Sequence, residues 1–148
     1  MKIAIGCDHG ALDYKNTIRD MLKQQGHEVI DCGTHTEDSC DYPIYGKAVA
    51  DAVAQGQVEK GIVICGTGIG ISIAANKVNG VRCSLCHDVT TARLTREHND
   101  SNVLAMGARV IGIEVAKDIV RTYLETPFSN GDRHIKRLEM ISEIEKEN

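Results

Sequence analysis

Tryptophan is absent from this chain of 148 residues, and aromatic residues make up only 3% of it. The core must therefore be aliphatic, and residues 1–148 are long enough to build one as a single domain. Basic residues do not predominate, because the net charge is -4, which argues against nucleic acid as a partner. No apolar run could span a bilayer, and the N-terminus lacks the apolar stretch of a signal peptide. We therefore expect no membrane partner and a cytoplasmic location.

The six cysteines form neither a disulfide framework nor a zinc pattern. Cys83 and Cys86 make one C-x-x-C, but a zinc site usually needs a second pair at a related spacing, and there is none. In a cytoplasmic chain of this size, cysteines are expected to be free thiols. We therefore expect no metal and no cofactor, with Cys83 and Cys86 on or beside a buried strand.

Apolar runs typical of strands alternate with apolar residues at helical spacing. Strands are predicted at residues 2–7, 28–32, 61–65, 81–86 and 102–106. Helices are predicted from Tyr14 to Gly26, from Tyr45 to Gly56, from a glycine turn to about Lys77, from the cap Asp88 to His98, from Val115 to Leu124, and over about 132–146.

Repeated strand–helix units predict an α/β fold, with a five-stranded parallel sheet and helices on both faces. In such sheets, ligands bind outside the carboxyl ends of the strands. Three chemically rich segments are expected at or beyond that edge: Asp8–His9, Cys65–Gly70 and His98–Asn99.

Cys65 ends the most strand-like segment of the chain and opens onto a glycine-rich turn at a helix start. The helix dipole and free amides there favour a thiolate, which could act as a base in proton abstraction. The amides of Gly66 to Gly70 could stabilise an enediolate, and Thr67 adds a hydroxyl beside them. The alternative is that Cys65 is a small buried hydrophobe that closes a strand.

The glycine segment differs from the nucleotide-binding motifs that it superficially resembles. A dinucleotide site needs G-x-G-x-x-G, but the third glycine position here holds Ile71 or Ile73, depending on where counting begins. A Walker loop is excluded because no Gly-Lys-Ser/Thr follows. An anion-binding turn and a plain tight turn remain.

Asp8 and His9 follow the first strand, where a carboxylate and an imidazole could open a sugar ring by proton transfer. They could equally be a capping Asp and a partly buried His. His98 and Asn99 raise the same question, because a charged imidazole is favoured at a helix C-terminus whether or not it has a function.

Arg133 and Arg137 lie four residues apart on the last predicted helix and so share one face. Two guanidiniums there could grip a phosphate, although they could also belong to a solvated basic face. Arg109, after the fifth strand, is a further candidate phosphate contact. His134 is expected to point elsewhere on the helix and is left out of the site.

Taken together, these segments resemble the ribose-5-phosphate isomerase B family, which also includes galactose- and allose-phosphate isomerases. The matching stretches are G-C-D-H at 6–9, D-Y-P at 41–43, I-C-G-T-G-I-G-I-S-I-A-A-N-K at 64–77, R-E-H-N-D-S-N-V-L-A-M-G-A-R-V at 96–110 and R-H-x-x-R at 133–137. The resemblance spans nearly the whole chain, and its long central motif is highly specific.

The resemblance implies a Rossmann-like three-layer sandwich that forms homodimers, in some members paired into tetramers, with active sites shared between subunits. The helix at about 132–146 is then a candidate for packing on the partner, and the His98 segment reaches into the partner's site. Some relatives replace the catalytic cysteine by a glutamate, but Ile71 occupies that place here.

The resemblance also implies a role for each matching residue. Cys65, Thr67, His98 and Asp8 match catalytic positions; His9, Tyr42, Gly66, Gly68, Ile69, Gly70, Asn99, Arg109, Arg133 and Arg137 match substrate-binding positions.

The expected reaction is metal-independent interconversion of ribose 5-phosphate and ribulose 5-phosphate through a cis-enediolate. Three alternatives stay open: isomerisation of allose or galactose 6-phosphate, a nucleotide-binding or sensory module that uses the glycine turn only for anions, and a catalytically silent subunit that needs a different partner chain.

Overall fold

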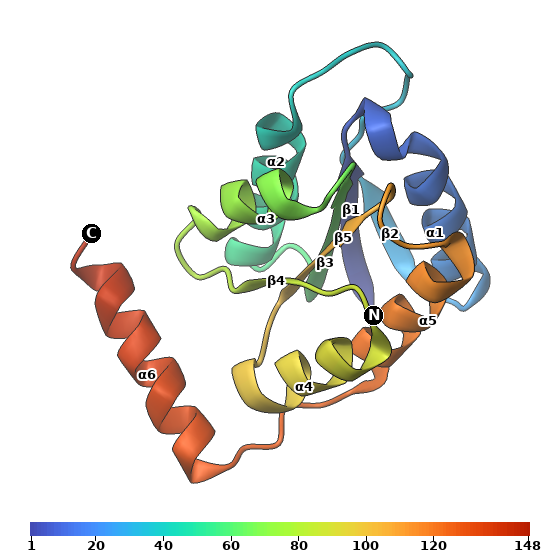
Figure 1. Ribbon diagram of the computed structural model, residues 1–148. Helices are drawn as coiled ribbons and strands as arrows, with labels where there is room; N and C mark the ends of the chain where they lie inside the picture. Colours follow the sequence, from blue (N-terminus) through green and yellow to red (C-terminus); the bar gives the residue numbers. More distant parts are fainter.

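The computed structural model describes all 148 residues and has a parallel five-stranded sheet at its centre (Figure 1). The strands are β1 (Lys2–Cys7), β2 (Glu28–Asp31), β3 (Lys60–Cys65), β4 (Cys83–Leu85) and β5 (Val103–Gly107). Their order across the sheet is β2-β1-β3-β5-β4. Strand β2 is added on one side of β1 and the later strands on the other side, so the order switches between β1 and β3. Such a switch opens a crevice at the carboxyl ends of the two strands.

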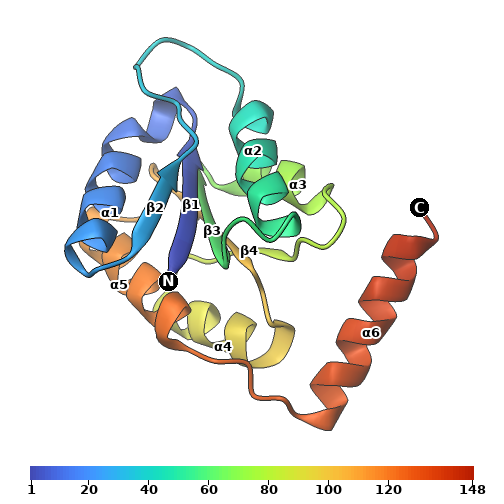
Figure 2. The same cartoon turned by 180° about the vertical axis from the view of Figure 1, so that it is seen from behind.

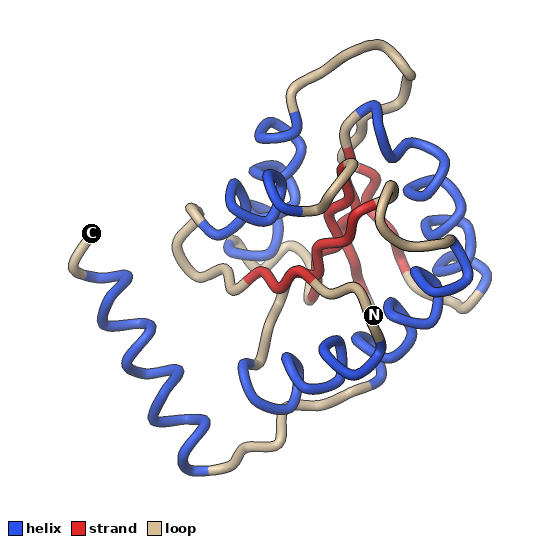
Figure 3. Tube along the Cα trace, in the orientation of Figure 1, coloured by secondary structure: helices blue, strands red, loops and turns tan.

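Helices cover both faces of the sheet (Figures 2 and 3). They are α1 (Leu12–Gln24), α2 (Tyr42–Ala54), α3 (Ile69–Asn76), α4 (Val89–Asn99), α5 (Ile113–Glu125) and α6 (Asp132–Lys146), with a 3-10 turn, η1 (His9–Ala11), before α1. One apolar cluster joins the sheet to α1, α4 and α5, and a second joins it to α2 and α3. The predicted α/β sandwich is therefore confirmed.

The three central strands β1, β3 and β5 are mostly aliphatic and buried on both faces, as parallel strands inside a sheet must be, whereas the edge strands β2 and β4 are partly exposed. Alternate side chains of β3 enter different clusters: Ile62 and Ile64 pack toward α1 and α5, whereas Val63 and Cys65 pack toward α2 and α3. This alternation follows from the two-residue period of a strand, and it decides which layer receives the sulfur of Cys65.

Two predicted elements differ from the observed ones at their ends. The fourth strand was predicted over 81–86 but covers only Cys83–Leu85, because the amide of Val81 closes a turn onto the carbonyl of Val78. The second helix starts at Tyr42, three residues earlier than predicted, since Pro43 fits the first helical turn. Asp88 caps α4 as predicted, accepting a 2.6 Å hydrogen bond from the amide of Thr91.

Helix α6 stands away from the body of the chain and meets it mainly near the end of α4 (Figure 1). Its apolar stripe therefore has little to pack against: Met140, Ile141 and Ile144 are 59%, 46% and 60% exposed. None of the helices is long and apolar enough to traverse a lipid bilayer.

Candidate active site

Cys65 lies at the carboxyl end of β3, where its sulfur accepts a hydrogen bond from the amide of Gly68 at 3.2 Å. The residue is only 5% exposed and its side chain borders the α2–α3 layer. Helix α3 begins at Ile69, so the sulfur sits against the start of a helix, as predicted.

The glycine turn after Cys65 is packed so tightly that larger residues would not fit. Gly68 has a φ of +77°, and a Cβ there would lie 2.5 Å from Leu85 and 2.7 Å from the backbone of Met106. A Cβ on Gly107 of β5 would lie 2.5 Å from the backbone of Thr67. The end of β5 therefore fixes the path of the turn, and the Thr67 hydroxyl accepts a bond from the amide of Ile69 at 3.2 Å.

Asp8 and His9 lie beside this turn, at the end of the neighbouring strand β1. Asp8 is 9% exposed and one carboxylate oxygen accepts a 3.0 Å bond from the amide of Gly10, so it does cap η1. Its other carboxylate oxygen has no hydrogen-bond partner in the chain. The Nδ1 of His9 accepts a bond from the amide of Cys40 at 3.1 Å, which leaves Nε2 as the free ring nitrogen.

The side chains of Tyr42 and Arg109, which come from other parts of the chain, pack against the glycine turn. The ring of Tyr42, at the start of α2, packs so closely on Gly70 that a Cβ there would lie 2.5 Å from it. Arg109 follows β5, and its side chain passes over Gly66, at 3.4 Å from where a Cβ would stand. The carboxyl edge therefore gathers the predicted residues Asp8, His9, Tyr42, Arg109 and the turn 65–70.

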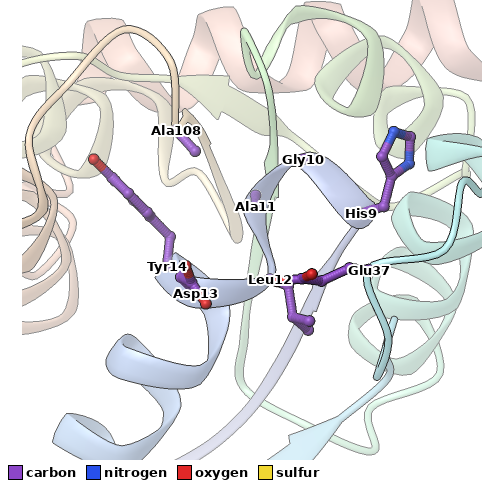
Figure 4. Close-up of a pocket in the computed structure, with 8 residues that line it drawn as sticks. All are labelled: His9, Gly10, Ala11, Leu12, Asp13, Tyr14, Glu37 and Ala108. Atoms are coloured by element: carbon purple, nitrogen blue, oxygen red, sulfur yellow. The ribbon is translucent and has the colours of Figure 1, made fainter.

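A cavity of about 380 Å³ opens beside the Asp8–Gly10 segment, on the α1 side of the site (Figure 4). His9 and Glu37 lie at one end of it, and Tyr14 and Ala108 at the other. Cys65 does not line this cavity. Gly10, which lines the cavity, adjoins the glycine turn: a Cβ on Gly10 would stand 3.9 Å from the amide nitrogen of Gly66.

His98 and Asn99 do not lie at this edge, so the expectation that their segment lies at or beyond the carboxyl ends of the strands was wrong. His98 and Asn99 end α4. The carbonyl of Asn102, which leads into β5, accepts a hydrogen bond from the amide of Gly61 at the amino end of β3. A helix that returns from one parallel strand to the next must end at the opposite edge of the sheet. Because α6 begins beside the end of α4, Arg133 and Arg137 belong to that edge too.

His134 is the residue that sequence reasoning missed. It is buried, and its ring stacks on that of His98 with centroids 4.5 Å apart and planes inclined by 14°. Desolvation, His98 and the nearby Arg133 and Arg137 lower the pKa of His134. Its place between the two arginines in R-H-x-x-R was a signal, but only the tertiary structure brings His98 against it.

The candidate residues thus fall into two groups at opposite edges of the sheet, which we call half-sites. The carboxyl-edge group is built around Cys65, and the amino-edge group consists of His98, Asn99, Arg133, His134 and Arg137. No three His, Cys, Asp or Glu side chains lie together so as to hold a metal ion, and all six cysteines are free.

Comparisons with known proteins show the family of the chain. Residues 3–141 match the model of the Ribose/Galactose Isomerase family. The chain is 51% identical to the ribose-5-phosphate isomerase B of Escherichia coli, covering 98% of this chain and 97% of the relative. It is 44% identical to the galactose-6-phosphate isomerase subunit LacB of Clostridium acetobutylicum, covering 99% and 86%.

A solved structure is equally similar. The ribose-5-phosphate isomerase B of Clostridium thermocellum superimposes with a TM-score of 0.98 at 55% identity, covering 99% of both chains. The resemblance inferred from the motifs is confirmed over the full length. The chain therefore belongs to the Ribose/Galactose Isomerase family and is a sugar-phosphate isomerase of the ribose-5-phosphate isomerase B type.

Proposed function

We propose that the chain interconverts ribose 5-phosphate and ribulose 5-phosphate, with Cys65 as the base. The observation that carries the proposal is the 3.2 Å hydrogen bond from the amide of Gly68 to the sulfur of Cys65, at a helix start and beside a glycine turn. A thiolate held there can remove a proton next to a carbonyl, and the surrounding amides can stabilise the resulting oxyanion.

In the proposed reaction, Asp8 and His98 open the furanose by moving a proton to the ring oxygen. Cys65 then takes the proton from C2 of the open aldose and returns it to C1, while a proton passes between the oxygens on C1 and C2. The amides of Gly66 to Gly70, together with Thr67, stabilise the cis-enediolate. No change in the overall oxidation state occurs, so the proposed steps require no external oxidant or reductant.

The other predicted residues bind the substrate in this proposal. His9, Tyr42, Ile69 and Asn99 contact the sugar, and Arg133 and Arg137 grip the phosphate with Arg109 as a further contact. Two guanidiniums on one helix face offer several donors to a phosphate.

The two half-sites support a homodimer with shared active sites. Cys65 and His98 belong to opposite edges of the same sheet, so one chain cannot bring both to one sugar. A second copy can, and the apolar face of α6 is left uncovered for it to bury. A two-fold axis would then complete two equal sites, and a pair of such dimers would give a tetramer.

A six-carbon substrate is the second candidate, because a galactose-6-phosphate isomerase subunit is 44% identical to this chain. One carbon more or less often changes an enzyme's preference only modestly. Steady-state kcat/KM values for ribose, allose and galactose phosphates would rank the candidates.

The base is tested with Cys65→Ala and Cys65→Ser, using Cys83→Ala as the matched thiol control in an edge strand outside the site. We expect both Cys65 variants to lose at least about a hundredfold in kcat, because general-base catalysis contributes on the order of 10²–10⁴. The control should remain active. Near-normal turnover by a folded Cys65 variant would remove this residue from the role.

A further inference from the structure

The connection between α5 and α6 is pinned to α4 at two points. Arg96, which is buried on α4, donates through Nε to the carbonyl of Thr126 at 3.1 Å. Further along, both the hydroxyl and the amide of Ser129 donate to the carbonyl of Glu97, at 2.6 Å and 3.2 Å. Glu97 lies in the last turn of α4, where carbonyls have no partner within the helix.

Ser129 therefore links the end of α4, which carries His98, to the start of α6, which carries Arg133 and Arg137. The proposed function uses these residues on one substrate molecule. The bonding partner of Ser129, Glu97, directly precedes His98, and four residues beyond Ser129 the chain reaches Arg133. The stacked ring of His134 is the other contact between these segments. The far end of α6 makes one further hydrogen bond with the body, from the amide of Gly80 to the carboxylate of Glu145 at 2.8 Å. The contacts of Ser129 and His134 are the ones that orient its first turn beside the end of α4 (Figure 1).

We propose that Ser129 is a positioning residue that fixes the spacing between His98 and the Arg133–Arg137 pair. The proposal rests on the function proposed above in one respect, namely that His98 acts on the ring and the arginines on the phosphate of one substrate molecule. The spacing then has to match the distance from the ring oxygen to the phosphorus.

That distance is a property shared by the two candidate substrates. In a furanose 5-phosphate and in a pyranose 6-phosphate, the ring oxygen and the phosphorus are separated by the same number of bonds. A change in the His98–arginine spacing should therefore affect both equally. Discrimination between five and six carbons is then left to the carboxyl-edge half-site, where the position of C1 differs.

The test compares Ser129→Ala with the conservative Ser129→Thr, which keeps the hydroxyl. Ser142→Ala is the control, since Ser142 lies on α6, the helix that carries Arg133 and Arg137, and makes no side-chain hydrogen bond. Three quantities are measured for each: kcat/KM for ribose 5-phosphate and allose 6-phosphate, the inhibition constant of inorganic phosphate, and the NMR shifts of the imidazole protons of His98 and His134.

We expect Ser129→Ala to lose about 3- to 10-fold in kcat/KM, the usual effect of one hydrogen bond. The ratio of the kcat/KM values for any two substrates that the wild type accepts should not change. The inhibition constant of phosphate should change less than about twofold, because phosphate alone needs only the arginines. Ser129→Thr and Ser142→Ala should resemble the wild type.

Three kinetic results would overturn the proposal: an unchanged kcat/KM in Ser129→Ala, a loss of phosphate affinity as large as the loss of kcat/KM, or a loss of kcat/KM in Ser129→Thr as large as that in Ser129→Ala. The NMR shifts test the proposal without substrate. Loss of the Ser129–Glu97 hydrogen bond should weaken the stack of His98 on His134 and move the shifts of both imidazoles toward the values of unstacked rings. Unchanged shifts in Ser129→Ala would contradict positioning, whereas a wild type inactive on every aldose phosphate would contradict the proposed function alone.

Discussion

Lys15 is fully buried, and its ammonium group donates a 2.8 Å hydrogen bond to the carboxylate of Asp31. Asp31 also accepts bonds from Arg19 and from the amide of Gly33, both at 2.9 Å. Lys15 donates as well to the carbonyl of Thr34. This network anchors the segment that pairs with the end of β1, immediately before the proposed site.

Replacing Lys15 by Met should destabilise the protein by about 3 kcal/mol, because it leaves a largely buried carboxylate with fewer partners. Urea-induced unfolding measures the change. The matched control is Lys117→Met, which removes a more exposed pair with Glu114 and should cost less than about 1 kcal/mol. Equal effects of the two substitutions would mean that burial of the Lys15 pair contributes nothing.

Acid should weaken the fold through Asp31. Burial alone would raise the pKa of Asp31, but hydrogen bonds from Lys15, Gly33 and Arg19 outweigh it and the net pKa is lowered from 3.8. The folded state then binds fewer protons than the unfolded state between the two pKa values. The contribution is complete above about pH 4 and is lost as the pH falls through the folded pKa. In Asp31→Asn, this part of the pH dependence of unfolding should disappear; an unchanged profile would assign it to other groups.

Gly107→Ala should impair both folding and activity, because the new Cβ would stand 2.5 Å from the backbone of Thr67. Backbone cannot yield as a flexible side chain can, so we expect roughly 2 kcal/mol or more of destabilisation and at least a tenfold loss in kcat/KM. Gly112→Ala is the control. Nothing lies within 4 Å of a Cβ there. Because Gly112 is the N-cap of α5, Ala at this position should lower the free energy of unfolding by no more than about 1 kcal/mol. Full activity and stability in Gly107→Ala would show that the glycine turn tolerates displacement.

Mixed dimers test whether the two half-sites come from different chains. A dimer of one Cys65→Ala subunit and one His98→Asn subunit has one doubly damaged site and one intact site. Equal amounts of both inactive variants, refolded together, should recover about a quarter of the wild-type activity per subunit, because half of the dimers are mixed.

The control for this experiment pairs Cys65→Ala with Asp8→Asn. Both changes lie in the same half-site, so every mixed dimer has a damaged residue in each site and should gain no activity. Absence of recovery in the first mixture, with mixed dimers shown to form, would mean that each chain completes its own site.

Local pattern was enough to predict most of the fold. The aliphatic run before Cys65 and the glycines after it predict a buried strand that opens into a helix start, because both features depend on neighbouring residues. The strand–helix alternation likewise predicted the parallel sheet and placed Asp8, His9 and Cys65 at one edge. The ends of β4 were missed because the turn at Val78–Val81 is closed by a backbone contact that has no residue signature.

The sequence by itself determined which side chains could do chemistry and that Cys65 opens onto a glycine turn at a helix start, since these follow from residue type and short-range periodicity. Only the tertiary structure decided that His98, His134 and Arg133 gather at the opposite edge of the sheet from Cys65. The physical reason is that a returning helix carries its last turn to the far ends of the strands, a displacement that spacing along the chain does not reveal.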